Sequence, residues 1–282
     1  MTWQVLPMPM LSKLSDMSAE QHTSDSTPSQ FQLFLLALSF LTRIPVKLNF
    51  AVSSQALNQA SRYFALVGVI LGVVLALSFL LLSWSFPAAI SVALVMAFSL
   101  IITGAFHEDG LADSMDALGG GWTKDRILEI MKDSRIGTFG TVALILILSF
   151  KFAASWTIAQ KSAHSFAITL IFAHTASRYL TSSLVDFMQY SGAGPGSKSK
   201  PMASTPLPAL YRLPGLLALL ISTIPFYDTP LLLLGFFPAL LVCIYWSSFI
   251  KKWIEGYTGD TLGALQQLTE VIIYLTAAMS WI

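Results

Sequence analysis

The sequence has few of the charged residues that a soluble domain carries at its surface. Charged residues make up 11% of its 282 positions, whereas soluble domains carry roughly 25%. Hydrophobic residues make up 55%, and the mean hydropathy is +0.68. Apolar runs of about 20 residues recur along the chain, a pattern typical of helices that cross a bilayer. The composition therefore predicts an all-α, polytopic membrane protein and argues against a soluble one.

The sequence also has a single cysteine and a formal net charge close to zero. The single cysteine, Cys243, cannot form an internal disulfide and lies in an apolar run, so we expect it to serve packing. The formal net charge is +1, which gives no indication of nucleic-acid binding. The first 30 residues lack the compact apolar region and cleavage site of a signal peptide. We expect residues 1–30 to be a disordered tail and residues 31–282 to be a single membrane domain.

Seven apolar segments are expected to cross the membrane. They are approximately residues 63–85, 88–103, 138–159, 164–185, 207–227, 230–249 and 268–282. An earlier apolar stretch, residues 31–40, is followed by Arg43 and Pro45. Its run of about 12 apolar residues is too short for a hydrocarbon core of about 30 Å. We interpret it as an interfacial or re-entrant helix.

The distribution of lysine and arginine predicts an orientation. With Arg62 on the cytoplasmic side, alternate crossings also place Arg212, Lys251 and Lys252 there, and Lys161 is almost alone on the other side. Basic residues accumulate on the cytoplasmic side of membrane proteins. That side also receives the polar, glycine-rich connections at residues 104–137, 186–206 and 251–267. We therefore expect a site that faces the cytoplasm rather than a path through the membrane.

Acidic residues are few and concentrated in one segment. Seven of the 15 lie between residues 104 and 140. Among them, Asp109, Asp113 and Asp116 are spaced i, i+4, i+7, which places them on one face of a helix. Mg²⁺ prefers oxygen ligands and binds one or two carboxylates together with substrate phosphates. We predict that these three aspartates hold Mg²⁺; the alternative is a helix with a solvated acidic face.

Glycines and basic residues beside the aspartates indicate an anion site. Gly119 and Gly120 belong to a glycine run whose backbone N–H groups could approach a phosphate, although such a run is usually only a turn. Lys132 and Arg135 follow and could contact the same phosphate. Lipid headgroups are the alternative partners of these two side chains.

Candidates from other segments complete the expected site. Arg178 lies one turn from His174 inside an expected span, where ionisable groups are costly and usually functional, so we expect Arg178 to bind phosphate. His107 is a candidate general base or ligand, with a structural hydrogen-bonding role as the alternative. In a second glycine-rich segment, Gly259 allows close backbone approach, and Asp260 could join the metal from another helix. A turn-forming role is the alternative for Asp260.

Four stretches of the chain resemble the cobalamin synthase family, adenosylcobinamide-GDP ribazoletransferase. They are residues 40–45, 104–113 with Asp116, 130–140, and 256–264 with Glu270. The second and third stretches are long and specific, and the four together extend over about residues 31–270. The family often has proline after a Tyr-Phe pair where this chain has Ala65, a difference limited to the start of a helix.

The resemblance implies a Mg²⁺-dependent enzyme of the bacterial inner membrane. Its expected substrates are adenosylcobinamide-GDP and α-ribazole or α-ribazole 5′-phosphate. The products are adenosylcobalamin or its phosphate, and GMP, in the last assembly step of the nucleotide loop of coenzyme B12. Other enzymes of B12 assembly and a second copy of the chain are further partners to consider.

A mechanism follows as a hypothesis from this resemblance. Mg²⁺ on the three aspartates would bridge the pyrophosphate, and a ribazole hydroxyl would attack the phosphorus attached to cobinamide, with GMP leaving. Asp116, or alternatively His107, would accept the hydroxyl proton. Lys132, Arg135 and Arg178 would offset the developing negative charge.

Two other classes of protein remain as alternatives. CDP-alcohol phosphatidyltransferases also use an Asp-Gly pair with spaced aspartates, but their pattern has Arg after the alanine where this chain has Asp113 after Ala112. A cation-coupled transporter would distribute acidic groups at mid-membrane over several helices. The sequence leaves open the lower-ligand base, the choice between ribazole and its phosphate, and the oligomeric state.

Overall fold

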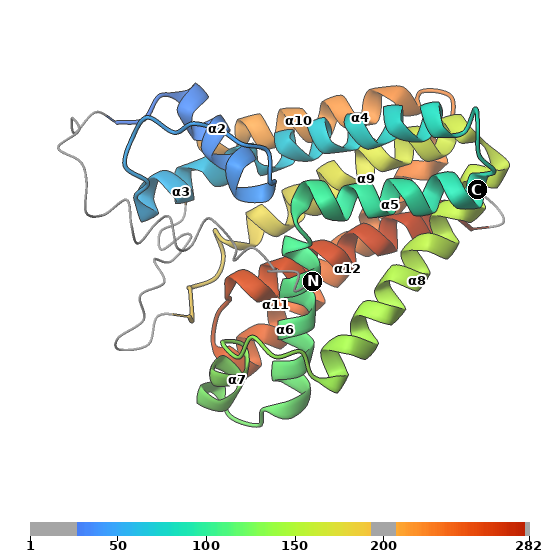
Figure 1. The fold of residues 1–282 in the computed structure, drawn as a ribbon. Coiled ribbons are helices and arrows are strands. Elements are labelled where there is room, and N and C mark those ends of the chain that lie inside the picture. The colour runs from blue at the N-terminus through green and yellow to red at the C-terminus, as the bar shows by residue number, and fades with distance from the viewer. Residues whose placement is uncertain (1–26, 193–206, 280–282) are drawn as a thin grey trace, which may run out of the picture.

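The computed structural model describes residues 27–192 and 207–279, and these residues form a bundle of helices (Figure 1). The α-helices are α2 Gln30–Leu41, α3 Ser54–Ala60, α4 Phe64–Leu82, α5 Ala88–Thr103, α6 Phe106–Gly120, α7 Lys124–Ile130, α8 Thr138–Lys161, α9 Ala163–Leu184, α10 Leu213–Thr223, α11 Phe236–Ile254 and α12 Gly259–Ala277. The only β-type pairing in the described ranges is an isolated parallel bridge between Tyr190 and Tyr257. The predicted all-α class is confirmed. The predicted disordered tail falls mostly on residues 1–26, outside the described residues.

Helices α9 and α12 form the centre of the bundle. Both are buried along most of their length, and together they contact α4, α6, α8 and α11. Figure 1 shows α4, α5, α9, α10 and α12 running lengthwise beside one another. A helix surrounded by protein need not present an apolar surface to lipid. Its polar side chains can instead meet partners on neighbouring helices.

Four helical segments in the described part of the chain are long and apolar enough to cross a membrane. They are Ser54–Leu82, Thr138–Lys161, Ala209–Phe226 and Pro230–Ile254; the bent pair α5 and α6 would be a fifth if it counts as one span. The seven expected spans also included α9 and α12. These two lie inside the bundle and carry polar residues, so composition alone does not mark them as spans. The chain is a polytopic helical membrane protein, and the count of seven membrane spans stays a prediction.

The acidic helix α6 lies across one end of the bundle. The axes of α5 and α6 differ by 86°. Between them, Gly104 (φ 68°) and Ala105 (φ 55°) adopt the left-handed conformation, which costs glycine little. Figure 1 shows α6 crosswise to α5, with α7 next to it. The acidic residues of α6 are therefore placed beside the ends of the spanning helices rather than along them.

The N-terminal apolar segment forms a short helix next to α4. Helix α2 begins at a capping box made by Ser29 and Gln32. Leu33 and Leu36 are fully buried in a hydrophobic cluster shared with α3 and α4. Its 12 residues reach about 18 Å, too short to cross the hydrocarbon core. This length agrees with the predicted interfacial or re-entrant helix. Helix α3 was not predicted, because its sequence is polar.

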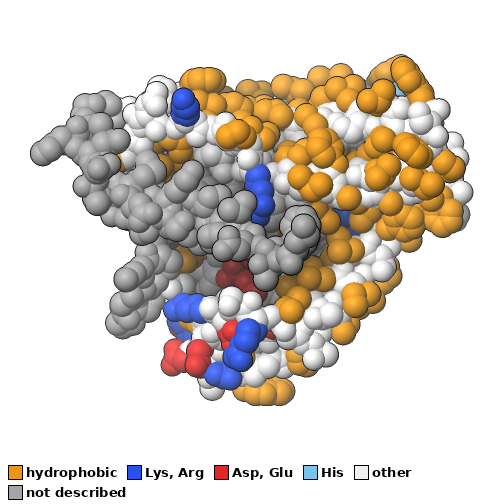
Figure 2. Space-filling view, in the orientation of Figure 1, with side chains coloured by type: hydrophobic (Ala, Val, Ile, Leu, Met, Phe, Trp, Pro, Cys, Tyr) orange, Lys and Arg blue, Asp and Glu red, His pale blue; other side chains and the backbone are white. Residues whose placement is uncertain are grey.

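The surface separates into an apolar part and a charged part. Figure 2 shows hydrophobic side chains over most of the right-hand part of the face, and acidic and basic side chains gathered at the lower left, around α6 and α7. Exposed large hydrophobic residues include Leu77 on α4, Ile101 on α5 and Ile145 on α8. An apolar surface of this extent fits contact with lipid.

The single cysteine serves packing, as predicted. Cys243 lies on α11 and is 9% exposed. Its Sγ atom is 4.0 Å from the carbonyl oxygen of Leu180 on α9. The thiol is therefore enclosed between two helices.

Candidate functional site

Three aspartates from two helices form an acidic face at the end of the bundle. Asp109 and Asp113 lie on α6, and Asp260 lies in the first turn of α12. The two helices approach closely, since a Cβ atom at Gly110 would lie 2.9 Å from the carbonyl oxygen of Asp260. Burial, together with the charges of Asp109, Asp260 and Asp116, raises the pKa of Asp113 to about 7. Carboxylates that repel one another in this way favour a cation between them.

The acidic face fits a magnesium ion that is completed by substrate. Within residues 27–192 and 207–279, no group of three or more His, Cys, Asp or Glu side chains is arranged to hold a metal by itself. Mg²⁺ often keeps several waters and uses only one or two protein carboxylates, with phosphate oxygens as further ligands. Asp109 is exposed and Asp113 is half-buried, so both carboxylates are accessible for such a role.

The third predicted ligand, Asp116, contacts the start of α8. Its Oδ2 accepts a hydrogen bond from the Gly137 backbone N–H at 2.6 Å, and its Oδ1 accepts one from Gly140 at 2.8 Å. A Cβ atom at either glycine would lie 2.4 Å from the carboxylate. Asp116 therefore connects α6 to α8, a role that the helical spacing did not predict. Its assignments as ligand and proton acceptor stay predictions.

We expect Asp116→Asn to destabilise the protein. The asparagine amide oxygen can accept from only one of the two backbone N–H groups, and its NH2 group would face the other, which would be left unsatisfied. The free energy of unfolding should fall by about 1–3 kcal/mol. Thermal unfolding in detergent measures the effect, and Asp125→Asn in exposed α7 is the control that should change little. Equal midpoints for the two variants would show that the contact contributes nothing.

The predicted anion-binding glycines form the last turn of α6. Gly119 and Gly120 are helical, and Gly121 is the C-cap. A Cβ atom at Gly119 would lie 2.5 Å from the ring of Phe139, so close packing with α8 accounts for glycine there. The anion-binding role of Gly119 and Gly120 stays a prediction.

The basic residues Lys132 and Arg135 lie on the loop between α7 and α8. Both side chains are exposed, and Arg135 pairs with Asp133 at 2.6 Å. The same loop contributes Gly137, which is bonded to Asp116 on α6. The loop is therefore held beside the acidic helix, and the phosphate-binding role of Lys132 and Arg135 stays a prediction.

A pocket next to the acidic face brings together residues from distant segments. Its aromatic wall is Phe40, Phe64 and Phe106, from α2, α4 and α6. The predicted residues His107, Arg178 and Gly259 also line it. We call this cavity the aromatic pocket. Because Asp260 directly follows Gly259, the pocket adjoins the acidic face.

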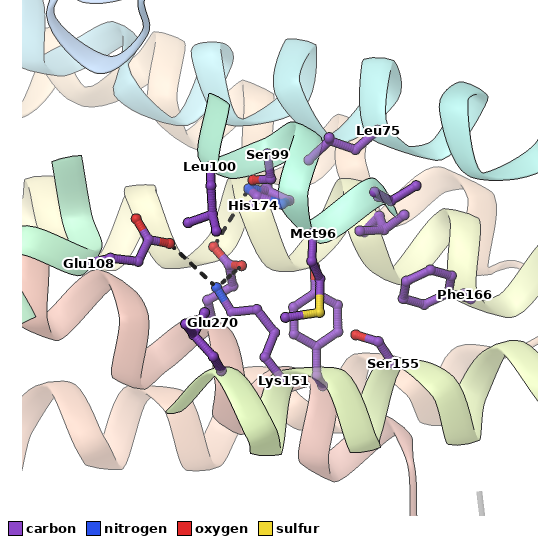
Figure 3. Close-up of a pocket in the computed structure, with 14 residues that line it drawn as sticks. Leu75, Met96, Ser99, Leu100, Glu108, Lys151, Ser155, Phe166, His174 and Glu270 are labelled. Atoms are coloured by element: carbon purple, nitrogen blue, oxygen red, sulfur yellow. Dashed lines mark ion pairs between the residues drawn. The ribbon is translucent and has the colours of Figure 1, made fainter. Parts of the chain in front are cut away.

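A second pocket is lined by Glu108, Lys151, His174 and Glu270, which belong to a buried network of charged side chains (Figure 3). Lys151 of α8 pairs with Glu270 of α12 at 2.9 Å, and its Nζ atom is 4.0 Å from Glu108 of α6. Lys151 also donates to Gln267 at 2.7 Å. Arg178 of α9 is 3.9 Å from Glu270. Two acids and two bases thus balance in charge, as buried ionisable groups in a membrane require.

His174 connects Arg178 to this network as a neutral acceptor. Its Nδ1 atom lies 3.0 Å from Nη1 of Arg178 and 3.5 Å from Oε2 of Glu270. Since a guanidinium can only donate, Nδ1 must accept, and the ring proton lies on Nε2. The contact with Glu270 is therefore not an ion pair.

Sequence reasoning identified part of this network. His174 and Arg178 were predicted because ionisable residues inside a span are usually functional. Lys151 and Glu108 were missed. Lys151 is the one lysine in the middle of the apolar run of α8, and this was the signal that could have revealed it. Arg178 is 2% exposed, so it belongs to the inner wall of the pocket rather than to an open surface.

The fold and this site define a polytopic membrane protein with a carboxylate-lined site at one end of its helix bundle. The family described as Cobalamin-5-phosphate synthase matches residues 33–278. The chain belongs to this family, and the predicted resemblance is confirmed.

Two curated relatives illustrate the similarity. The chain is 41% identical over 256 residues to the adenosylcobinamide-GDP ribazoletransferase of Leptospira interrogans, covering 89% of this chain and 97% of the relative. It is 44% identical over 251 residues to the adenosylcobinamide-GDP ribazoletransferase of Vibrio parahaemolyticus, covering 88% and 92%. No solved structure matches the chain.

Proposed function

We propose that this protein is an adenosylcobinamide-GDP ribazoletransferase of cobalamin biosynthesis. It joins adenosylcobinamide-GDP to α-ribazole or its 5′-phosphate and releases GMP. The observation that carries the proposal is the position of the acidic face beside the aromatic pocket, at one end of a membrane bundle. The acidic face suits a pyrophosphate bound through a metal ion, and the aromatic pocket suits an uncharged organic group. The family and the names of its relatives support the same activity.

The acidic face is the proposed Mg²⁺ site. Asp109 and Asp113 would be the protein ligands, with Asp260 beside them on α12. Mg²⁺ would neutralise pyrophosphate oxygens and so favour departure of GMP. This assignment places the metal at the α6–α12 junction rather than at Asp116, because both oxygens of Asp116 already accept backbone hydrogen bonds.

Basic side chains would act at two places in the site. Lys132 and Arg135 are exposed on a loop fixed to α6 and would bind phosphate oxygens from the open side. Arg178 was predicted to bind phosphate, but it is already paired with Glu270 and bonded to His174, so it would contact the organic part of a substrate instead. His107 lines the aromatic pocket, so it is better placed than Asp116 to accept the proton of the attacking ribazole hydroxyl.

The proposed location is the bacterial inner membrane, with the acidic face toward the cytoplasm. The basic residues near α6 and α7, such as Lys124 and Arg126, support this orientation. Soluble nucleotide substrates would then reach the site directly.

A reconstituted reaction tests the activity. The purified full chain in detergent is incubated with adenosylcobinamide-GDP and α-ribazole, and cobalamin and GMP are measured together. Both products should appear in equal amounts with Mg²⁺ and disappear after EDTA treatment. Release of GMP without cobalamin, or product formation in EDTA, would contradict the proposal.

A further inference from the structure

Two buried hydrogen-bond donors in the aromatic pocket lack partners within the described part of the chain. They are Nε of Arg178 and Oγ1 of Thr181. Arg178 is 2% exposed and Thr181 is 8% exposed, and both residues line the pocket. A buried polar group without a hydrogen bond costs about 1–3 kcal/mol, so such groups usually serve a bound molecule. The pocket therefore favours an occupant that brings a hydrogen-bond acceptor.

The charge balance around the pocket favours a neutral occupant. Arg178 is already matched by Glu270, and the next residue beyond Gly259 is the acidic Asp260. An anion in the pocket would meet this carboxylate without an unmatched cation to offset it. A neutral acceptor can take the N–H of Arg178 without disturbing the balance.

The opposite wall favours a flat aromatic occupant. The rings of Phe40 and Phe64 are stacked at 5.7 Å and 9°, and Phe106 meets Phe40 edge to face at 5.3 Å. The ring of His107 continues this wall beside Phe106 at 5.4 Å. Gly259, which also lines the pocket, has open space where a Cβ atom would be. Aromatic rings and an open glycine in one lining favour a planar ring.

We propose that the aromatic pocket binds the base of the ribazole substrate. This inference rests on the proposed function and assigns one of its two substrates to a subsite. The dimethylbenzimidazole base of α-ribazole is neutral, bicyclic and largely apolar, and it has one unprotonated ring nitrogen. That nitrogen accepts from Arg178 or Thr181 while the ring packs on Phe40 and Phe106. The ribose then points toward the acidic face, where its hydroxyl reacts.

The guanine of the other substrate fits the pocket less well. Guanine has acceptors that arginine can bind, but it also carries N–H donors on the adjacent edge. Arg178 Nε can only donate, and the phenylalanines of the pocket offer no acceptor. The donors of guanine would therefore depend on the few acceptors of the pocket, such as His107 and Gln266, whereas the base of α-ribazole needs none. The two substrates can be distinguished by binding.

Thr181→Val tests the assignment, because valine keeps the shape of threonine and removes the hydroxyl. Equilibrium dialysis with the full chain in detergent measures the Kd of α-ribazole and of GMP without the corrinoid. We expect the Kd of α-ribazole to rise roughly 3- to 10-fold and that of GMP to stay unchanged. Thr175→Val is the matched control on α9, since its hydroxyl is bonded to the Ile171 carbonyl oxygen and should not affect ribazole.

Two further measurements keep the test decisive. Phe40→Leu should also weaken α-ribazole and spare GMP, and it replaces Thr181→Val if that variant does not fold. Three outcomes would overturn the subsite. They are an unchanged Kd of α-ribazole in the folded variant, an equal rise in the Kd of GMP, and no binding of α-ribazole to the unaltered protein. Turnover at saturating substrates is measured on the same preparations. Its absence in the unaltered protein refutes the proposed function, whereas turnover with unaffected ribazole binding refutes only the subsite.

Discussion

Asp113→Asn should reduce turnover by on the order of 10³-fold or more while the protein stays folded. Asparagine keeps the shape of aspartate but removes the negative charge that would hold Mg²⁺ beside the pyrophosphate. The charges of Asp109, Asp260 and Asp116 all act on Asp113, so we expect its loss to weaken the acidic face most. The measurement is GMP release at several Mg²⁺ concentrations, with thermal unfolding in detergent as the test of folding.

The same substitution should not destabilise the protein. Its neighbours repel the carboxylate of Asp113 when no cation is bound, so neutralising it relieves an unfavourable interaction. Asp125→Asn, on exposed α7, is the control and should keep near-normal turnover. If Asp113→Asn also kept near-normal turnover, Asp113 could not be a metal ligand.

Lys151→Met should cause the largest loss of stability. The side chains of Lys151 and Glu270 are 10% and 2% exposed, and removing one partner of a buried pair typically costs about 3–5 kcal/mol. Methionine fills the volume but leaves Glu108 and Glu270 with one nearby cation, Arg178, in place of two. The expected result is a large decrease in the unfolding midpoint in detergent and poor yield of folded protein.

Two comparisons separate the effect of charge from that of packing. Lys151→Met with Glu270→Gln removes one charge of each sign, so the double variant should recover much of the lost stability. Lys124→Met removes an exposed ion pair with Glu255 of similar length, 2.6 Å, and should change stability by about 0–1 kcal/mol. If the double variant is no more stable than Lys151→Met, charge balance is not what holds these helices together.

The local parts of the fold could be predicted from the sequence. Thr123 is the N-cap of α7 and accepts a hydrogen bond from the Arg126 backbone N–H. Such a cap can be recognised from the sequence because it depends on residues close in the chain. The helical acidic segment was predicted from the spacing of Asp109 and Asp113. The short helix before Arg43 followed from the length of the apolar run.

Contacts between distant segments could not be predicted in the same way. Helical spacing groups Asp116 with the other aspartates, but tertiary contact with Gly137 and Gly140 decides where its carboxylate points. Thr181 is one of three threonines in α9, and only the pocket formed by five helices distinguishes it from the others. The metal-binding and turn-forming roles of Asp260 were both left open for the same reason, since its neighbours lie on α6, far away in the chain.

Because the thiol of Cys243 is enclosed, an introduced cysteine can report which end of the bundle lies on which side of the membrane. A cysteine introduced at an exposed position would be the only accessible thiol in the molecule, because the native one lies between α9 and α11. With Asp125→Cys at the acidic end of the bundle, a reagent that cannot cross membranes would label intact cells only if that end faced outward. Because Cys243 is enclosed, labelling of the introduced cysteine gives a direct way to determine which end of the bundle faces the cell interior.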